Sequence, residues 1–167
     1  MKKLLFILTA TCWTISLSIH IVSLTGFDVA TWFPYVWALH IGVFVVFIPA
    51  LLILRKFQHT PHPTYRSYFS GLPRWLIILT VACCLYAVIN FFLFAFSFHG
   101  TATIRDGQYV LLRHGSIIKT LTELEYRWHN SQAVRLFSGH WMAFYSLAMI
   151  ILYPSVWPGR QAPTAII

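Results

Sequence analysis

The sequence contains very few acidic residues. Asp and Glu together number 4 in 167 residues, Lys and Arg number 12, and all charged residues make up only 10% of the chain. Soluble domains usually carry about 25% charged residues. With a hydrophobic fraction of 58% and a mean hydropathy of +0.69, this composition excludes an ordinary soluble domain and indicates an integral membrane protein. The net charge of +8 does not indicate nucleic-acid binding, because the basic residues flank apolar segments, where they set orientation and contact lipid headgroups.

Cysteine motifs of the C-x-x-C type and known catalytic motifs are also missing. Cys12, Cys83 and Cys84 all fall in apolar runs, and no C-x-x-C or C-x-x-C-H pattern occurs, which disfavours both dithiol exchange and covalently attached c-type haem. The sequence has no P-loop, dinucleotide fingerprint, nucleophile elbow or zincin motif. The apolar runs contain no carboxylate, so a proton-coupled transporter is the weakest of the functions considered.

Four apolar runs are each long enough to cross a bilayer, which takes about 20 residues. The first has a basic start like that of a signal peptide, but no A-x-A site follows it, so we predict that it is a retained span. Pro49 is expected to kink the second span, which neighbouring helices can tolerate. The predicted spans are residues 4–24, 32–54, 74–98 and 137–157.

The segment between the third and fourth spans predicts a small β-meander. Asp106-Gly107 and His114-Gly115 are two-residue turn signals, with Gly available for positive φ. Thr122 precedes Glu125 by three residues, which is the capping-box spacing at the start of a helix. A single long helix is therefore expected from residue 123 through the fourth span. The predicted strands are 101–105, 108–113 and 116–121, with Tyr109, Leu111 and Ile117 as candidate buried positions.

The predicted fold is all-α membrane: a four-transmembrane-helix bundle with a small extramembrane three-stranded β-meander before the last helix. Residues 1–98 hold three spans, residues 99–136 the meander and the start of the long helix, and residues 137–167 the fourth span and a tail. Basic residues without acids flank one predicted side, which places both termini in the cytoplasm of a bacterial inner membrane and residues 99–136 outside it. These basic residues are Lys2, Lys3, Arg55, Lys56, Arg66, Arg74 and Arg160.

Histidines provide the only constellation with cofactor chemistry. His20, His40, His99 and His140 lie in or beside the four spans, one on each, all toward the predicted outer side. Polar groups in a membrane are costly and usually face a bundle interior or a cavity. Two opposed imidazoles among these four could bind haem b through its axial positions. The alternative is that each histidine hydrogen-bonds separately to a carbonyl or a headgroup.

A bound Cu or Zn ion is a weaker alternative. Its ligands would come from His20, His40 and His140, joined by Glu125 and His129, which are spaced i, i+4 on the predicted long helix. No H-x-x-x-H or E-x-x-H pair strengthens this interpretation.

The remaining polar and small residues favour packing and partner contacts. Asn90 inside the third span predicts a helix–helix hydrogen bond. Gly139 and Ala143 form a small-x-x-x-small pair that serves either internal packing or a partner helix. A further alternative is an outer basic patch that docks an acidic partner or an anionic substrate, formed by Arg113, Arg127 and Arg135.

These observations predict a non-enzymatic accessory or assembly subunit in a lipid bilayer. It would present residues 99–136 to a membrane protein partner, with Gly139 and Ala143 as a second contact surface. The alternative function is a membrane redox or metal-handling protein that uses the histidines.

Overall fold

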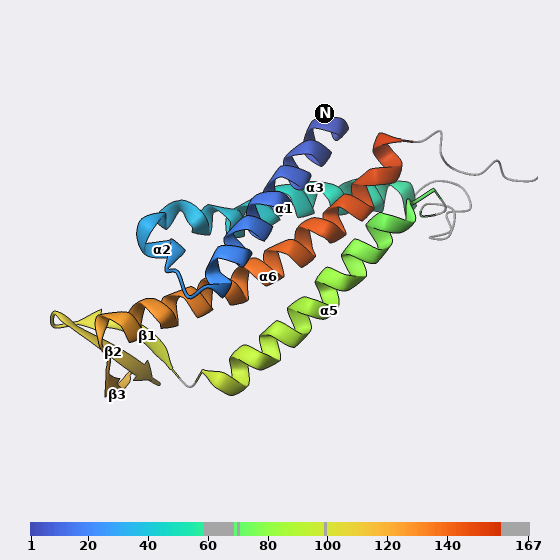
Figure 1. Cartoon of the computed structure of the whole chain (residues 1–167). Helices are drawn as coiled ribbons and strands as arrows, with labels where there is room; N and C mark the ends of the chain where they lie inside the picture. Colours follow the sequence, from blue (N-terminus) through green and yellow to red (C-terminus); the bar gives the residue numbers. More distant parts are fainter. Residues whose placement is uncertain (59–68, 70, 99, 158–167) are drawn as a thin grey trace, which may run out of the picture.

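The computed structural model of the chain describes residues 1–58, 69, 71–98 and 100–157. It is mostly helical, with one small antiparallel sheet (Figure 1). Its helices are α1 (Lys2–Leu24), α2 (Val29–Trp32), the 3-10 helix η1 (Pro34–Trp37), α3 (Ala38–Gln58), α5 (Arg74–Ser97) and α6 (Glu123–Val156).

Four segments in the described residues are long and apolar enough to cross a membrane. They are Lys2–Leu24, Pro34–Lys56, Arg74–Ser97 and Glu123–Val156. They coincide with the four apolar runs of the sequence. The fourth is longer because the polar residues 123–136 continue it as one helix, as the capping-box signal predicted.

Helix α6 is the centre of the bundle, and α1, α3 and α5 all pack against it (Figure 1). In its most apolar stretch 67% of the residues are buried, against 22 to 28% in the other three long helices. The other helices therefore expose most of their apolar surface outward, as expected when the surrounding solvent is lipid. The fully buried side chains of α6 include Val134, Trp141, Tyr145 and Leu152.

The connection between α1 and α3 differs from the expected loop over residues 25–31. Asp28 caps α2, where its carboxylate accepts a hydrogen bond from the Thr31 backbone N–H at 3.2 Å. Pro34 then starts η1, since proline fits the first turn of a helix, where its missing N–H is not needed. The second span consequently begins in a 3-10 turn, and α3 carries Pro49 in its interior.

The sheet has the predicted meander order β1-β2-β3 with antiparallel pairing. Both central residues of each turn have positive φ. The first central residue is Asp106 in one turn and His114 in the other, both at φ +50°, and the second is a glycine in each. This matches the type I′ geometry that favours glycine at the second position. The strands are β1 (Thr101–Arg105), β2 (Gln108–Arg113) and β3 (Ser116–Thr120).

Burial in the sheet agrees only in part with the sequence prediction. Leu111 is buried, and Tyr109 is half-buried with its ring 4.7 Å from that of Tyr126 on α6. The prediction that Ile117 is buried was wrong, since its side chain is 50% exposed. The cause is that all five residues of the edge strand β3 are exposed, so neither of its faces is covered. Its pairing with β2 is also irregular, since Leu111 pairs with Lys119 and Leu112 with Ile117, which leaves one residue of β3 bulged.

Candidate functional site

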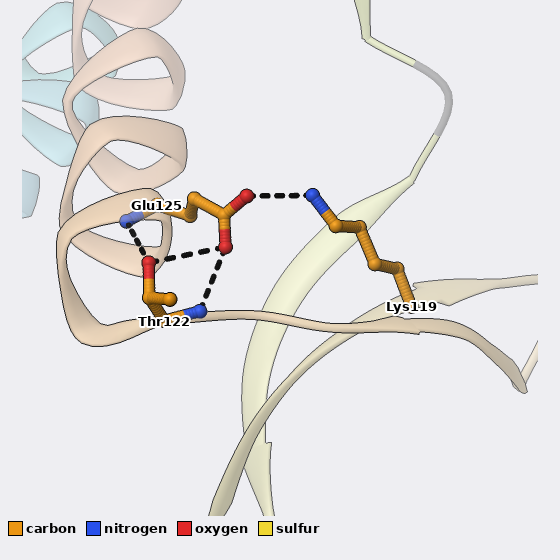
Figure 2. A network of polar contacts seen from close by, with 3 residues as sticks. All are labelled: Lys119, Thr122 and Glu125. Carbon is orange, nitrogen blue, oxygen red and sulfur yellow. Dashed lines mark hydrogen bonds and ion pairs between the residues drawn. The ribbon is translucent and has the colours of Figure 1, made fainter.

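A capping network joins the sheet to α6 (Figure 2). The Glu125 backbone N–H donates to Thr122 Oγ1 at 3.2 Å, and the Thr122 N–H donates to Glu125 Oε2 at 2.8 Å, which completes the predicted capping box. Lys119 of β3 donates to Glu125 Oε1 at 2.6 Å. These contacts, led by the Lys119 hydrogen bond, lower the pKa of Glu125 to about 2. The sheet is thus fixed to the first turn of the central helix.

The second polar cluster lies inside the bundle, where α1, α5 and α6 meet. His20 of α1 is buried, and its two ring nitrogens contact two different helices. Nδ1 is 2.9 Å from Ser138 Oγ of α6, and Nε2 is 2.6 Å from the Tyr86 hydroxyl of α5. The His20 side chain therefore connects three helices at one point.

The partners of this cluster determine the direction of its hydrogen bonds. Ser138 donates its one hydroxyl proton to the Arg135 carbonyl at 3.1 Å, so it accepts from His20 Nδ1–H. In the neutral imidazole, Nε2 is then unprotonated and accepts from the Tyr86 hydroxyl. For neutral His20 this gives one directed chain from Tyr86 through His20 and Ser138 to the backbone of α6.

Asn90 lies one helical turn beyond Tyr86 on α5 and extends the cluster. Its Nδ2 donates to the carbonyls of Arg135 at 3.2 Å and Leu136 at 3.4 Å. This is the helix–helix hydrogen bond that the sequence predicted for Asn90. Gly139 makes room for it, since a Cβ at that position would lie 2.9 Å from Asn90 Nδ2.

Gly139 and Ala143 are both buried on the side of α6 that packs against α5. Ala143 belongs to a cluster with Met142 and with Cys83 and Ala87 of α5. Within the described chain these two small residues thus serve internal packing.

His40 and His140 make separate contacts on α3 and α6. Trp141 Nε1 donates to His40 Nδ1 at 3.2 Å, and the His40 side chain is exposed. His140 Nδ1 donates to the Leu136 carbonyl of its own helix at 2.8 Å, which leaves Nε2 with a free lone pair. His140 lines an apolar groove of about 370 Å³ between α5 and α6, together with aromatic residues that include Phe91, Phe92 and Phe144.

Glu125 and His129 do not join these histidines. Glu125 is held by Thr122 and Lys119, and His129 packs at ring distances of 5.5 Å on Phe98 and 5.3 Å on Trp128. Partial burial, followed by the positive charge of Lys119, lowers the pKa of His129.

The structure does not bring the predicted ligands together in one place. Over residues 1–58, 69, 71–98 and 100–157, no three His, Cys, Asp or Glu side chains lie close enough to hold a metal ion. The predicted ligand His99 lies outside the described residues. Of the histidines that are described, His20 and His40 each bond to other side chains, and only His140 presents a free lone pair to a groove.

Most of the internal cluster was not predicted from the sequence. Tyr86, Ser138 and Arg135 were not assigned to a site with His20, although Tyr86 and Asn90 are spaced i, i+4, and Arg135 and Ser138 i, i+3. Polar residues at these spacings share one helix face, and this was the available signal. The chain matches no known protein family, curated protein or solved structure in sequence or fold comparisons.

Proposed function

We propose that this chain is a multi-pass membrane protein that acts as a non-enzymatic accessory subunit and binds a protein partner through strand β3. Its four long apolar helices cross the membrane, both termini lie in the cytoplasm, and the sheet lies on the other side. The ends of α1 and α6 that are remote from the sheet lie at the same end of the bundle (Figure 1), which is consistent with this topology. All four acidic side chains lie on the proposed outer side, as the charge pattern of the sequence predicts.

The observation that carries the proposal is the exposure of β3. All five residues of this edge strand are exposed, and Ile117 and Ile118 expose 50% and 49% of their surface. An exposed edge strand with apolar side chains presents unpaired backbone N–H and C=O groups to which another chain can pair. Proteins use such edges to add an extended segment of a partner to the sheet.

The capping network gives this edge a fixed position. Lys119, which belongs to β3 itself, bonds to Glu125 on α6, and only Leu121 separates the strand from the cap residue Thr122. A partner segment paired with β3 would therefore be held rigidly at the end of the central helix. We infer that the partner is a membrane or extracytoplasmic protein that contributes an extended segment.

Site-specific photo-cross-linking in intact cells tests this function. A photoreactive residue placed at Ile117 or Ile118 is expected to yield one defined cross-linked protein. The matched control is Ile104, which is 56% exposed on the opposite edge strand β1, and should not yield it. In the protein that carries the probe at Ile117, the additional substitution Ile118→Lys should abolish the cross-linked product. Equal cross-linking at Ile104 would refute a specific edge contact.

A reporter fusion tests the proposed orientation separately. Alkaline phosphatase inserted after Gly107 in the β1–β2 turn is expected to be active, because that enzyme folds only outside the cytoplasm. The same reporter after Lys56 should be inactive. The opposite pattern would invert the topology while leaving the exposed edge of β3 in place.

A redox or metal-handling role is the second candidate, and the free Nε2 of His140 in its apolar groove favours it. This groove could supply one axial imidazole to a haem or one ligand to a metal ion. An absorption spectrum and elemental analysis of the purified protein test this role. A Soret band or bound metal that is lost in His140→Ala and kept in His40→Ala would support it, and a colourless, metal-free protein would refute it.

A further inference from the structure

An apolar groove of about 380 Å³ lies between the beginning of α1 and the end of α3. Both of these helix ends are remote from the sheet, at the end of the bundle that the proposed topology places in the cytoplasm (Figure 1). α1 and α3 have few contacts with each other, which leaves space between them. The groove is lined by residues that include Lys2, Leu5, Pro49, Leu52, Ile53 and Lys56.

The groove is apolar toward the middle of the spans and basic at their edge. The four lining residues of α3 are spaced i, i+3, i+4 and i+7, so they form a stripe on one helix face that is about 10 Å long. Pro49 is at the inner end of this stripe. Lys2 is the first residue of one candidate span and Lys56 the last residue of another, so both lysines lie at the level where the apolar segments end.

Lys2 and Lys56 have no anionic partner within the protein. Both side chains are exposed, and neither forms an ion pair in the described part of the chain. The chain has only 4 acidic side chains, and none lies at this end. Asp28 caps α2 beyond the far end of α1, a helix about 35 Å long, and the others lie in the β1–β2 turn and the first turn of α6. An anion at the two lysines must therefore come from outside the chain.

The arrangement of the groove is complementary to a phospholipid. An ammonium group binds phosphate as a point charge, and the half-buried side chains of Leu5, Pro49 and Ile53 offer an apolar surface for an acyl chain. The bilayer itself holds a phospholipid with its phosphate at the ends of the spans and its acyl chains between them. A soluble anion would leave the apolar part of the groove unused, and an apolar protein segment would leave both lysines without an anion.

We propose that Lys2 and Lys56 bind the phosphate of an anionic phospholipid whose acyl chain lies in the groove between α1 and α3. This inference rests on the membrane location proposed above and not on partner binding by β3. The bound lipid fills the space between two helices that otherwise have few contacts. Basic residues at an anionic bilayer surface each strengthen binding about fivefold, so removal of either lysine should weaken lipid binding by about that factor.

Photo-labelling of the full-length protein in phosphatidylcholine vesicles tests this site. The vesicles contain a small fraction of phosphatidylglycerol that carries a photoreactive group in its acyl chain, and mass spectrometry locates the labelled residues. The labels are expected to concentrate on Leu5, Leu52 and Ile53. Unlabelled phosphatidylglycerol should displace the probe, whereas additional phosphatidylcholine or inorganic phosphate should not.

Matched variants separate the charge from the apolar surface. Lys2→Gln and Lys56→Gln should each reduce labelling about fivefold at equal probe concentration. Lys3→Gln removes an exposed cation from the next position of α1, outside the groove, and should label like the wild type. Leu52→Trp fills the groove without a change of charge and should also reduce labelling, whereas Leu51→Trp, on an exposed side chain outside the groove, should not.

Several results would overturn the proposal. Labels spread evenly over the exposed face of α3, or equal displacement by phosphatidylcholine, would indicate ordinary bilayer contact. An equal loss in Lys3→Gln would indicate a diffuse basic surface, and displacement by inorganic phosphate would indicate a site for soluble anions. Absence of labels from the groove in a protein that resists alkaline carbonate extraction would mean that protein covers it. Extraction of the protein by carbonate would instead refute the membrane assignment, so the two failures are distinguishable.

Discussion

Substitution of Gly139 by alanine should be close to neutral for the stability of the wild type and stabilising when Asn90 is also removed. In the wild-type background a Cβ at this position would lie 2.9 Å from Asn90 Nδ2, which is closer than such atoms approach. The amide must then rotate away and lose its bonds to the carbonyls of Arg135 and Leu136. In Asn90→Ala this obstacle is absent, and the methyl group meets Tyr86 Cε1 at an ordinary 3.5 Å.

The magnitudes follow from two opposing contributions. Hydrogen bonds between membrane helices contribute about 0.6 kcal/mol each on average, so loss of both costs about 1 kcal/mol. Alanine gains about 1 kcal/mol over glycine in a helix interior. Gly139→Ala should therefore be close to neutral in the wild type and stabilising by about 1 kcal/mol in Asn90→Ala, which gives a coupling free energy of about 1 kcal/mol.

Reversible unfolding in mixed micelles, measured for the wild type, both single variants and the double variant, gives this coupling. Ala143→Gly is a useful control, because it alters the same face of α6 one turn away without contacting Asn90. If Gly139→Ala has the same effect in both backgrounds, the close approach of Asn90 does not determine this packing, and the assignment of the interhelical hydrogen bonds is wrong.

Three further outcomes test the cap and the internal cluster. Thr122→Ala should destabilise the start of α6 by about 1 kcal/mol, which amide exchange would detect as a faster rate in its first turn. Thr122→Ser should keep the wild-type rate, and equal rates in both variants would argue against the capping box. Because the folded-state pKa of Glu125 is lowered to about 2 from its usual 4.5, its contribution to stability is fully present above pH 4.5 and is lost as the pH falls toward 2. A Glu125→Gln variant should lack this pH dependence in an NMR titration of the first-turn amides. The same pH dependence in that variant would show that another group causes it. Tyr86→Phe removes the hydroxyl that contacts His20 Nε2 and should lower the free energy of unfolding by about 1 kcal/mol. The control Tyr35→Phe, at a residue that is 75% exposed, should not lower it. Similar effects of the two substitutions would mean that the Tyr86–His20 hydrogen bond adds no stability.

The local features of the fold could be predicted from the sequence because short-range chemistry determines them. The two X-Gly turns set the meander, and Thr122 with Glu125 sets the start of α6. Each of these signals lies within a few residues of the structure it specifies. The exposure of Ile117 could not be predicted in this way, since it depends on whether any distant part of the chain covers β3.

The internal cluster depends on helix rotation, which apolar composition leaves undetermined. A histidine near the end of a span can face a cofactor, a headgroup or another helix, and the sequence alone allows all three for His20. The structure places it against Ser138 and Tyr86 because α1 and α5 each pack on α6. Arg135 was predicted only as part of a surface patch, since its burial depends on the same packing.

The central position of α6 has a consequence for biosynthesis. α1 and α3 touch each other only sparingly, while each of α1, α3 and α5 packs mainly on α6, which follows all three in the chain. Until α6 is made, the three preceding long helices lack the helix on which each of them mainly packs, and the polar atoms of His20 and Asn90 lack their acceptors on α6. The bundle as a whole can therefore form only after residues 123–156 have been made, and a chain that stops before residue 123 lacks the helix that joins the other three.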